Sequence, residues 1–404
     1  MRLSLPYLDW QLLFATLGLI AMGLLAVYSA TSVPGAHQGL WAKQLVWFGV
    51  AFVAAWLVVG IHYRVYDSLA WPLYGVSLGL LVAVLAVGTE RLGAKRWIEL
   101  GPVQFQPSEL AILATTFVIA RYLDHARLDL RRPRWWVPPL FIMAVPFALV
   151  AREPDLGTAS SFPAILIALY YWAGMPAGQL LLGLSPVFNV VLFFLTGSVW
   201  WFAGLFAGLL ALARPRLTVL LVMLALNGAV SVGLPRLWGH LHDYQKRRIE
   251  TFLKPEDDPT GAGYQVIQSK IAIGSGGVLG KGYLKGTQKA LAFLPMRHTD
   301  FIYSVVGEEL GFAGSLTVVL LYLVVVVRGY RLAAVARDGF AGLMAVGVIT
   351  ALCFHVLVNM LMTVGWAPVT GVPLPFLSYG GTALIVNCVQ IGLLQNVALR
   401  RREF

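Results

Sequence analysis

The sequence predicts an all-α polytopic integral membrane protein, for three reasons. The chain has 404 residues, of which 58% are hydrophobic and only 12% are charged, whereas a soluble domain carries about 25% charged residues. Its apolar residues gather in runs of about 20, the length that crosses a bilayer as a helix. Its charged residues concentrate in short segments between those runs. We therefore expect a single transmembrane domain over residues 1–404, a bundle of about 10–12 helices.

Twelve apolar runs are candidate membrane spans. The first follows Arg2 and could imitate a signal peptide, but it is long for one and further spans follow, so we interpret it as a retained helix. The run 199–213 is short enough to be re-entrant or interfacial. The runs are 9–30, 41–61, 70–88, 106–123, 136–151, 158–176, 178–196, 199–213, 217–235, 301–327, 340–363 and 376–398.

The basic residues indicate how the chain is oriented. The net charge of +11 could suggest a nucleic-acid partner, but the arginines cluster in alternate short loops, as the positive-inside rule describes. The loop 89–105 is the one short exception. We therefore expect cytoplasmic N- and C-termini, no nucleic-acid partner, and one large extracytoplasmic loop at 236–300. The basic residues of the inner segments are Arg64, Arg127, Arg131, Arg132, Arg134, Arg214, Arg216, Arg328, Arg331, Arg337, Arg400, Arg401 and Arg402.

A glycine-rich run, residues 273–288, lies in the large loop. It lacks the Gly-Lys-Ser/Thr and the preceding strand of a nucleotide-binding P-loop. Two interpretations remain. Its amides, with Lys270, Lys281 and Lys285, could contact a pyrophosphate at the membrane surface. The spacing alone favours the simpler interpretation, a solvated loop.

Asp300 ends the polar segment 297–300, directly before the apolar run 301–327. A carboxylate there usually caps a helix, and composition alone favours that interpretation. A partly desolvated carboxylate at the interface could also act as a general base. Glu308 and Glu309 lie about two turns deeper, where ionisable groups are costly and usually face a partner or a cavity.

Further polar residues interrupt the apolar runs. Glu109 either caps the helix that begins near Ser108 or anchors the outer loops, and the residues favour neither. The segment 152–155 could be an ion-pair cluster or part of an anion site. His355, Asn359 and the Pro- and Gly-rich segment 368–381 are typical of broken helices that line a cavity. The seven histidines are scattered, so no metal site is indicated.

The motifs together closely resemble the RodA/FtsW family of shape, elongation, division and sporulation proteins, and within it the elongation branch. The resemblance extends over nearly the whole chain in the right order. The motifs are GAKRWIELG (93–101), FQPSELA (105–111), EPDLGTA (153–159), the segment from Phe252 to Gly314 that contains SKIAIGSGG and HTDF, and PVTGVPLPFLSYGGTALI (368–385).

This resemblance implies a peptidoglycan glycosyltransferase in the bacterial plasma membrane that polymerises lipid II by inverting β-1,4 transfer, with a divalent cation such as Mg or Mn as a candidate cofactor. It implies a class B penicillin-binding protein and other membrane proteins of the elongation complex as partners. It makes Asp300 of HTDF the essential carboxylate, which reverses the capping interpretation. The weaker candidates are Arg96, Arg152 and Lys270 for substrate binding, and Glu109, His298 and Glu309 for support.

The chain departs from the family pattern in three places. Ile112 replaces a lysine that follows the family's membrane glutamate, and Met296 replaces the glutamate of LPERHTDF. The region 178–235 looks about two helices too long.

Two other classes of function remain open from the sequence. A lipid II flippase would also need many helices and buried carboxylates, although the polar motifs concentrate on the outer side. A non-catalytic scaffold for the penicillin-binding protein would tolerate replacement of Asp300.

Overall fold

The computed structural model describes most of the chain. Arg2, Pro154 and Gln288, which were named among the sequence features, lie outside the described residues, as do five of the inner-loop arginines: Arg127, Arg131, Arg214, Arg216 and Arg402. The described residues are 7–32, 39–91, 94–100, 103–125, 130, 132–153, 155–196, 199–213, 215, 217–240, 246, 250–252, 254, 261–287 and 296–401.

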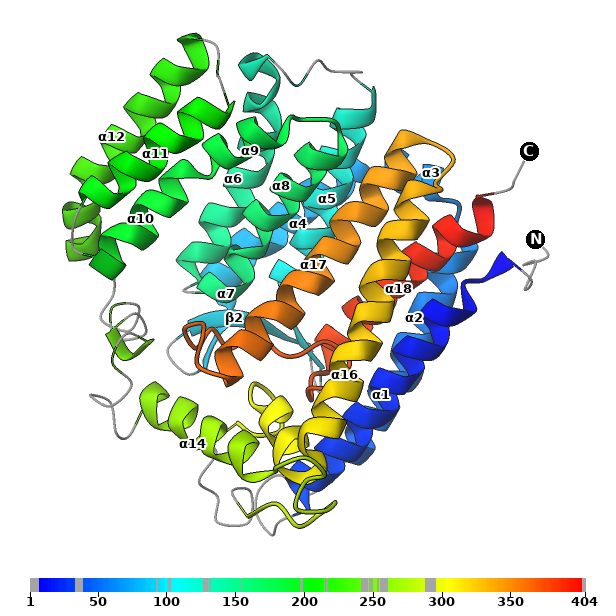
Figure 1. Cartoon of the computed structure of the whole chain (residues 1–404). Helices are drawn as coiled ribbons and strands as arrows, with labels where there is room; N and C mark the ends of the chain where they lie inside the picture. The colour runs from blue at the N-terminus through cyan, green and yellow to red at the C-terminus, as the bar shows by residue number, and fades with distance from the viewer. Residues whose placement is uncertain are drawn as a thin grey trace.

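The described chain folds as a helical bundle (Figure 1), which confirms the predicted fold class. Each of the twelve predicted spans contains at least one helix. The helices are α1 (Trp10–Thr31), α2 (Leu40–Gly60), α3 (Tyr63–Ser68), α4 (Ala70–Val87), α5 (Pro107–His125), α6 (Val137–Arg152), α7 (Leu156–Ala159), α8 (Ser161–Trp172), α9 (Ala177–Gly183), α10 (Ser185–Thr196), α11 (Val199–Ala213), α12 (Leu217–His240), α14 (Ala262–Ser275), α16 (Ile302–Ala334), α17 (Gly339–Thr363) and α18 (Gly381–Arg400), with a short 3-10 helix at Pro133–Trp135.

Some predicted spans are broken helices. The run 178–196 forms two short helices, α9 and α10, which meet at Leu184. The run 158–176 contains the join of α7 and α8, at Ser160. The run 376–398 becomes helical only at Gly381, so the residues before it form an irregular segment that lies at the site described below.

Among the residues that the structure describes, six helices are long and apolar enough to cross a membrane: α1, α2, α4, α16, α17 and α18. The most apolar stretches of α17 and α18 are 72% and 83% buried, whereas those of α2 and α4 are only 17% and 28% buried. Large apolar side chains such as Phe52 and Val87 are exposed on α2 and α4. Such a surface suits a helix whose outer face contacts lipid rather than water.

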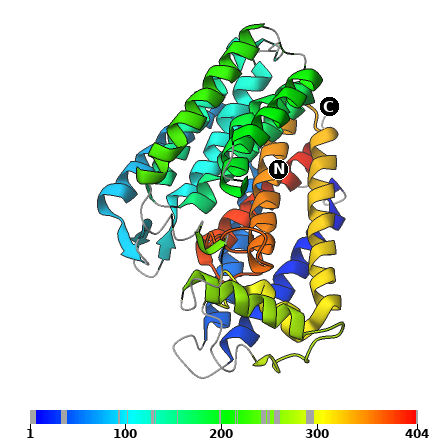
Figure 2. The ribbon, with the colours of Figure 1, turned by 60° about the vertical axis from the view of Figure 1, so that its left-hand side comes forward.

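A small antiparallel sheet, which the sequence did not predict, occupies the segment after α4. It comprises β1 (Thr89–Arg91), β2 (Ala94–Leu100) and β3 (Val103–Phe105), in the order β1-β2-β3. Thr89 pairs with Trp97, and Ile98 with Phe105. The sheet packs against α4, α5 and α18. It lies at the same level of the bundle as the segment before α18 (Figure 2).

Both ends of the chain lie at one end of the bundle, and α14 lies at the other (Figure 1). The helices α10 to α12 form one flank of the molecule, and α1 and α2 form the opposite flank. Asn227 on α12 donates to Ser185 (2.8 Å), and Asn189 on α10 donates to Ser231 (2.8 Å). These buried amides tie α10 to α12 inside the flank.

Candidate active site

Asp300 lies in the turn before α16, and its neighbours come from α17 and the loop that follows it. The N-cap position of α16 belongs to Phe301, which makes no side-chain cap bond. Asn359 donates to the carbonyl of Asp300 (2.9 Å) and to that of Val372 (2.8 Å). A Cβ built on Gly371 would lie 3.6 Å from Asp300 Oδ2. The Asp300 carboxylate therefore faces the segment 370–372.

The HTDF turn is fixed through its backbone. The amide of Tyr379 donates to the His298 carbonyl (2.8 Å), and the Ser378 hydroxyl donates to the Thr299 carbonyl (2.6 Å). The His298 side chain is buried, and its ring lies 6.1 Å from that of Tyr379. The segment before α18 therefore holds the turn in place from outside α16. The His298 ring contributes to this packing, and its supporting role in the reaction stays a prediction.

Met296 explains one departure from the family pattern. Its carbonyl accepts from the amides of Thr299 (3.1 Å) and Phe301 (3.4 Å), and its φ of 52° lies in the left-handed region. Its side chain is 38% exposed. The residue therefore closes the turn through its backbone, which either a methionine or a glutamate supplies. Next to it, Arg297 donates to the Ala30 carbonyl (2.9 Å), and partial burial lowers the pKa of its guanidinium.

A second polar group surrounds Asp155, at the start of α7. Its carboxylate accepts from Gln106 (3.1 Å) and from both the amide (3.2 Å) and the hydroxyl (2.9 Å) of Thr158. Arg96 lies 3.8 Å from the Asp155 carboxylate and donates to the carbonyl of Glu153 (3.2 Å). One alternative for 152–155 was an ion-pair cluster within the segment. Asp155 instead pairs with Arg96 of β2, outside the segment.

Glu153 lies next to this group in the loop between α6 and α7. Its side chain is fully buried, and neither of its carboxylate oxygens has a hydrogen-bond partner among the described residues. Its pKa is raised to about 8, chiefly by burial and also by the neighbouring charge of Asp155, while the charge of Arg96 opposes the rise. Glu153 is therefore largely protonated at neutral pH.

The turn that carries Asp300 and the polar group around Asp155 both lie beside the segment 370–372. A Cβ built on Gly157 would lie 2.5 Å from a Val372 methyl and 2.9 Å from Thr370 Cβ, so α7 packs directly on this segment. One turn before Asn359 on α17, His355 forms a 2.9 Å hydrogen bond with Ser161 of α8. The segment 370–372 thus lies between Asp300 on one side and the Asp155 group on the other.

The other predicted site residues lie in different surroundings. Arg152 and Lys270 are both exposed. A Cβ on Gly365 would lie 3.8 Å from Lys270 Nζ, so this lysine lies over the turn after α17. Glu109 is buried in the first turn of α5, three residues after Gln106. Ile112, where the family has a lysine, is fully enclosed in the apolar core.

Glu308 and Glu309 contact the glycine-rich run rather than Asp300. The amides of Leu284 and Gly286 donate to the Glu309 carboxylate (3.2 and 3.3 Å), and that of Thr287 donates to the Glu308 carboxylate (2.7 Å). These amides are therefore not available to a phosphate. The side chains of Tyr283, Leu284 and Lys285 are exposed, as the prediction of a solvated loop requires, but the backbone of this part of the run is bonded to α16.

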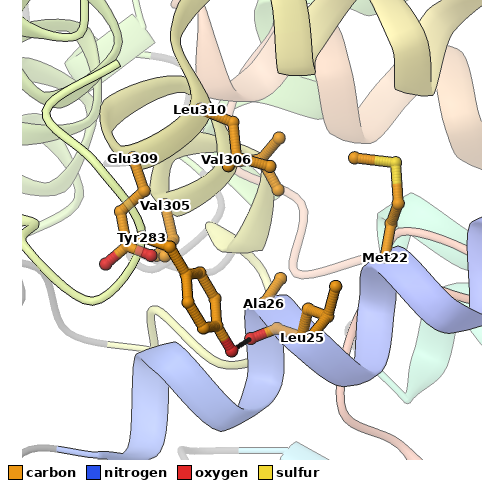
Figure 3. Close-up of a pocket in the computed structure, with 8 residues that line it drawn as sticks. All are labelled: Met22, Leu25, Ala26, Tyr283, Val305, Val306, Glu309 and Leu310. Atoms are coloured by element: carbon orange, nitrogen blue, oxygen red, sulfur yellow. Dashed lines mark hydrogen bonds between the residues drawn. The ribbon is translucent and has the colours of Figure 1, made fainter. Parts of the chain in front are cut away.

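A cavity of about 150 Å³ lies between α1 and α16. Figure 3 shows its lining, which is apolar except for Tyr283 and Glu309. Neither Asp300 nor any member of the Asp155 group lines it. Within the described part of the chain, no three His, Cys, Asp or Glu side chains are arranged to hold a metal ion.

Several residues of the site were not predicted from the sequence. Gln106 and Thr158 bind Asp155 and Ser161 binds His355, but none of them was singled out. Each is a polar side chain at the edge of or within an apolar run, which was the one available signal. The pairing itself joins residues up to 194 positions apart, so no local pattern could reveal it.

Comparisons with known proteins agree with the motifs. The FtsW/RodA/SpoVE family model, described as "Cell cycle protein", matches residues 10–202 and 187–403. The peptidoglycan glycosyltransferase MrdB of Escherichia coli K12 is 38% identical over 397 residues, which cover 98% of this chain and 95% of that protein. Stage V sporulation protein E of Bacillus subtilis is 33% identical over 398 residues, which cover 96% of this chain and 96% of that protein.

Solved structures are similar over the same length. One, described as showing the coordination of polymerization and crosslinking by a peptidoglycan synthase complex, has a TM-score of 0.75 at 33% identity and covers 98% of this chain and 99% of that one. Another, the rod shape determining protein RodA of Thermus thermophilus, has a TM-score of 0.66 at 28% identity, with 98% of each chain covered. With these matches spanning nearly all of its length, the chain belongs to the FtsW/RodA/SpoVE family.

Proposed function

We propose that this chain is a peptidoglycan glycosyltransferase of cell elongation, which polymerises lipid II into glycan strands. The family membership and the similarity to MrdB, itself named a peptidoglycan glycosyltransferase, support this function. One observation carries the mechanism: the Asp300 carboxylate lies outside the N-cap position of α16 and faces the segment 370–372. A carboxylate that caps α16 would lie at the N-cap position. Asp300 lies outside that position, as we expect of a base that acts on a bound substrate.

The proposed reaction is a single inverting displacement. The 4-hydroxyl oxygen of the acceptor sugar attacks the anomeric carbon of the donor as Asp300 takes the hydroxyl proton. The bond between the anomeric carbon and the phosphate oxygen breaks, and undecaprenyl pyrophosphate leaves with the bonding electrons. Because this leaving group is stable as an anion, the reaction needs no strong general acid and one carboxylate is enough.

The basic candidates divide into two kinds. Arg152 and Lys270 are exposed, so their charged groups can reach a diphosphate or a sugar. Arg96 instead bonds to Asp155 and to the Glu153 backbone, so we propose that it organises the site.

We also propose that a divalent cation, Mg or Mn, binds the diphosphate of the substrate. The described residues contain no cluster of three His, Cys, Asp or Glu side chains that could hold such an ion, so the diphosphate oxygens would supply most of its ligands. Removal of divalent cations with EDTA, followed by return of Mg or Mn, tests the requirement through polymerisation and thermal stability.

The site also fits a particular cellular placement. We propose that the chain lies in the bacterial plasma membrane with both termini in the cytoplasm, so that Asp300 meets substrate on the outer side. The synthase complex among the similar structures couples polymerization to crosslinking, and we propose a class B penicillin-binding protein as partner here.

The test is polymerisation of purified lipid II by the protein together with a penicillin-binding protein whose transpeptidase site is inactivated. We compare wild type with Asp300→Ala, Asp300→Asn and a matched control, Asp124→Asn, which makes the same carboxylate-to-amide change at the far end of α5. Wild type and the control should form glycan strands and both Asp300 variants should form none.

Each alternative gives a different result in this assay. A non-catalytic scaffold would give no strands even with wild type and would move no lipid, whereas strands formed by the Asp300 variants would show that another group is the base. A flippase would give no strands even with wild type, but would move labelled lipid II across the bilayer of a vesicle. Folding and complex formation of every variant are checked by size-exclusion chromatography.

A further inference from the structure

The helix α16 is interrupted at Gly311, which has a φ of 65° and a ψ of −158°. In a continuous helix the amides of residues 312 and 313 would donate to the carbonyls of residues 308 and 309. Here the Phe312 amide donates to Gly277 (2.9 Å) and the Ala313 amide donates to Val278 (3.0 Å). The segment 276–287, which we call the glycine wedge, has entered the helix at this point.

The wedge also satisfies the carbonyls on the other side of the break. The amide of Lys281 donates to the Glu308 carbonyl (3.0 Å), and that of Gly282 donates to the Glu309 carbonyl (3.1 Å). Two helical hydrogen bonds are thus replaced by four bonds to the wedge. The four backbone groups that lose these helical partners are therefore satisfied by the wedge, as irregular backbone at membrane depth requires.

Glycines make this close approach possible. A Cβ on Gly280 would lie 2.1 Å from the Glu309 carbonyl oxygen, and a Cβ on Gly276 would lie 2.0 Å from the Gly307 carbonyl oxygen. A Cβ on Gly286 would lie 2.9 Å from the Glu308 carboxylate and 3.0 Å from that of Glu309. Any larger residue at these positions would push the wedge away from α16.

The carboxylate of Glu309 binds the wedge from the side of α16, and we call this set of hydrogen bonds a clasp. The carboxylate is 2% exposed and accepts from Ser29 of α1 (2.6 Å) and from the amides of Leu284 and Gly286. Figure 3 shows Tyr283 of the wedge beside Glu309, with its hydroxyl donating to the Leu25 carbonyl of α1 (3.1 Å). The wedge is thus attached to both α1 and α16.

The carboxylate of Glu308 makes a second clasp. It is also 2% exposed, and one of its oxygens accepts from Lys281 Nζ (2.8 Å) and from the amide (2.7 Å) and hydroxyl (2.9 Å) of Thr287. Such charge-assisted bonds are about twice as strong as neutral ones. The negative charges of Glu308 and Glu309 are therefore stabilised by hydrogen-bond donors of the wedge.

We propose that Glu308 and Glu309 are positioning residues for Asp300. Residues 302–310 form a short rigid helix that begins two residues after Asp300 and ends at the break. The wedge sets the direction of this half-helix, and the two carboxylates hold the wedge. Loosening the clasp lets the half-helix turn, which moves Asp300 relative to Asn359 and Gly371. This inference rests on the proposed function of Asp300.

The test uses Glu308→Gln and Glu309→Gln, which keep the side-chain shape but remove the charge. We expect kcat to fall by about tenfold to hundredfold, the effect of a misplacement on the order of 1 Å, while KM for lipid II stays nearly constant. Hydrogen exchange should become faster in the wedge and also in the turn 296–301. Thr317→Ala, which removes a hydroxyl from the far half of α16, is the matched control and should match wild type in both measurements.

Gly286→Ala provides a second route to the same result, because it keeps both carboxylates and displaces the wedge from the other side. It should also lower kcat and speed exchange in the turn. The inference is overturned if the wedge exchanges faster while the turn and kcat are unchanged, or if KM alone rises. If wild type makes no glycan, the proposed function fails, and unchanged exchange in the turn of these variants would separately overturn the mechanical link.

Discussion

Glu153 is the residue whose protonation should control stability. Its pKa in the folded protein is about 8, against about 4.3 in an unfolded chain. The folded state therefore holds more protons between these values, so stability is highest below the lower pKa and is lost as pH rises through about 8. Glu153→Gln should retain the low-pH stability and show a flatter profile between pH 5 and 9. Thermal unfolding in detergent at several pH values measures this; an unchanged slope would contradict the assignment.

Asp155 organises the second polar group through several bonds at once. Asp155→Ala leaves Gln106 and Thr158 without the acceptor of their hydrogen bonds in a buried place, which costs about 1–3 kcal/mol for each group left unsatisfied. It also removes the ion-pair partner of Arg96. Asp155→Asn keeps one carboxamide oxygen as acceptor and should cost less. Thermal unfolding of the two variants should rank alanine below asparagine, and the reverse order would refute the arrangement.

At the scale of elements, the end of α2 depends on α18. Arg400 is 2% exposed and donates to the carbonyls of Val59 (3.1 Å) and Gly60 (3.2 Å), while Asn396 donates to that of Val58 (2.8 Å). These carbonyls end α2 and have no helical partner. A cation at a helix C-terminus also interacts favourably with the helix dipole.

Arg400→Ala should therefore destabilise the protein by about 1–3 kcal/mol, because buried carbonyls lose a charged donor. Arg400→Lys should recover part of this loss, since an ammonium reaches one carbonyl but lacks the planar fork. Arg401→Ala, one position further along the chain, is the control. Denaturant unfolding should place lysine between alanine and wild type; equal values for alanine and wild type would show that α18 does not cap α2.

For the whole molecule, the arrangement of the helices fixes the orientation of every loop once one is known. The proposed orientation places the exposed Trp366 outside and the exposed Val335 inside. In a protein whose Cys353 and Cys388 are replaced by serine, Trp366→Cys should react with an impermeant maleimide added to intact cells. Val335→Cys should react only after the membrane is opened. The opposite pattern would reverse the proposed topology and put Asp300 on the cytoplasmic side.

Much of the fold could be predicted from the sequence, because lipid imposes a local rule. Every span needs its own run of apolar residues, so runs such as 41–61 and 340–363 predict α2 and α17 almost to the residue. Broken segments were harder to predict: the break at Gly311 lies where residues distant in sequence, Gly277 and Val278, supply hydrogen-bond acceptors. Local composition carries no record of those partners.

The sequence by itself determined the membrane fold and the family, and its HTDF motif predicts Asp300 as the base, since motif residues and apolar length are properties of the chain alone. The tertiary structure decided which charges meet. Arg96 rather than Arg152 reaches Asp155 because a short sheet carries it there. Glu308 and Glu309 hold the glycine wedge because the helix opens at Gly311. In a low-dielectric interior a charge is stable only beside its partner, and only the packing of the helices places those partners.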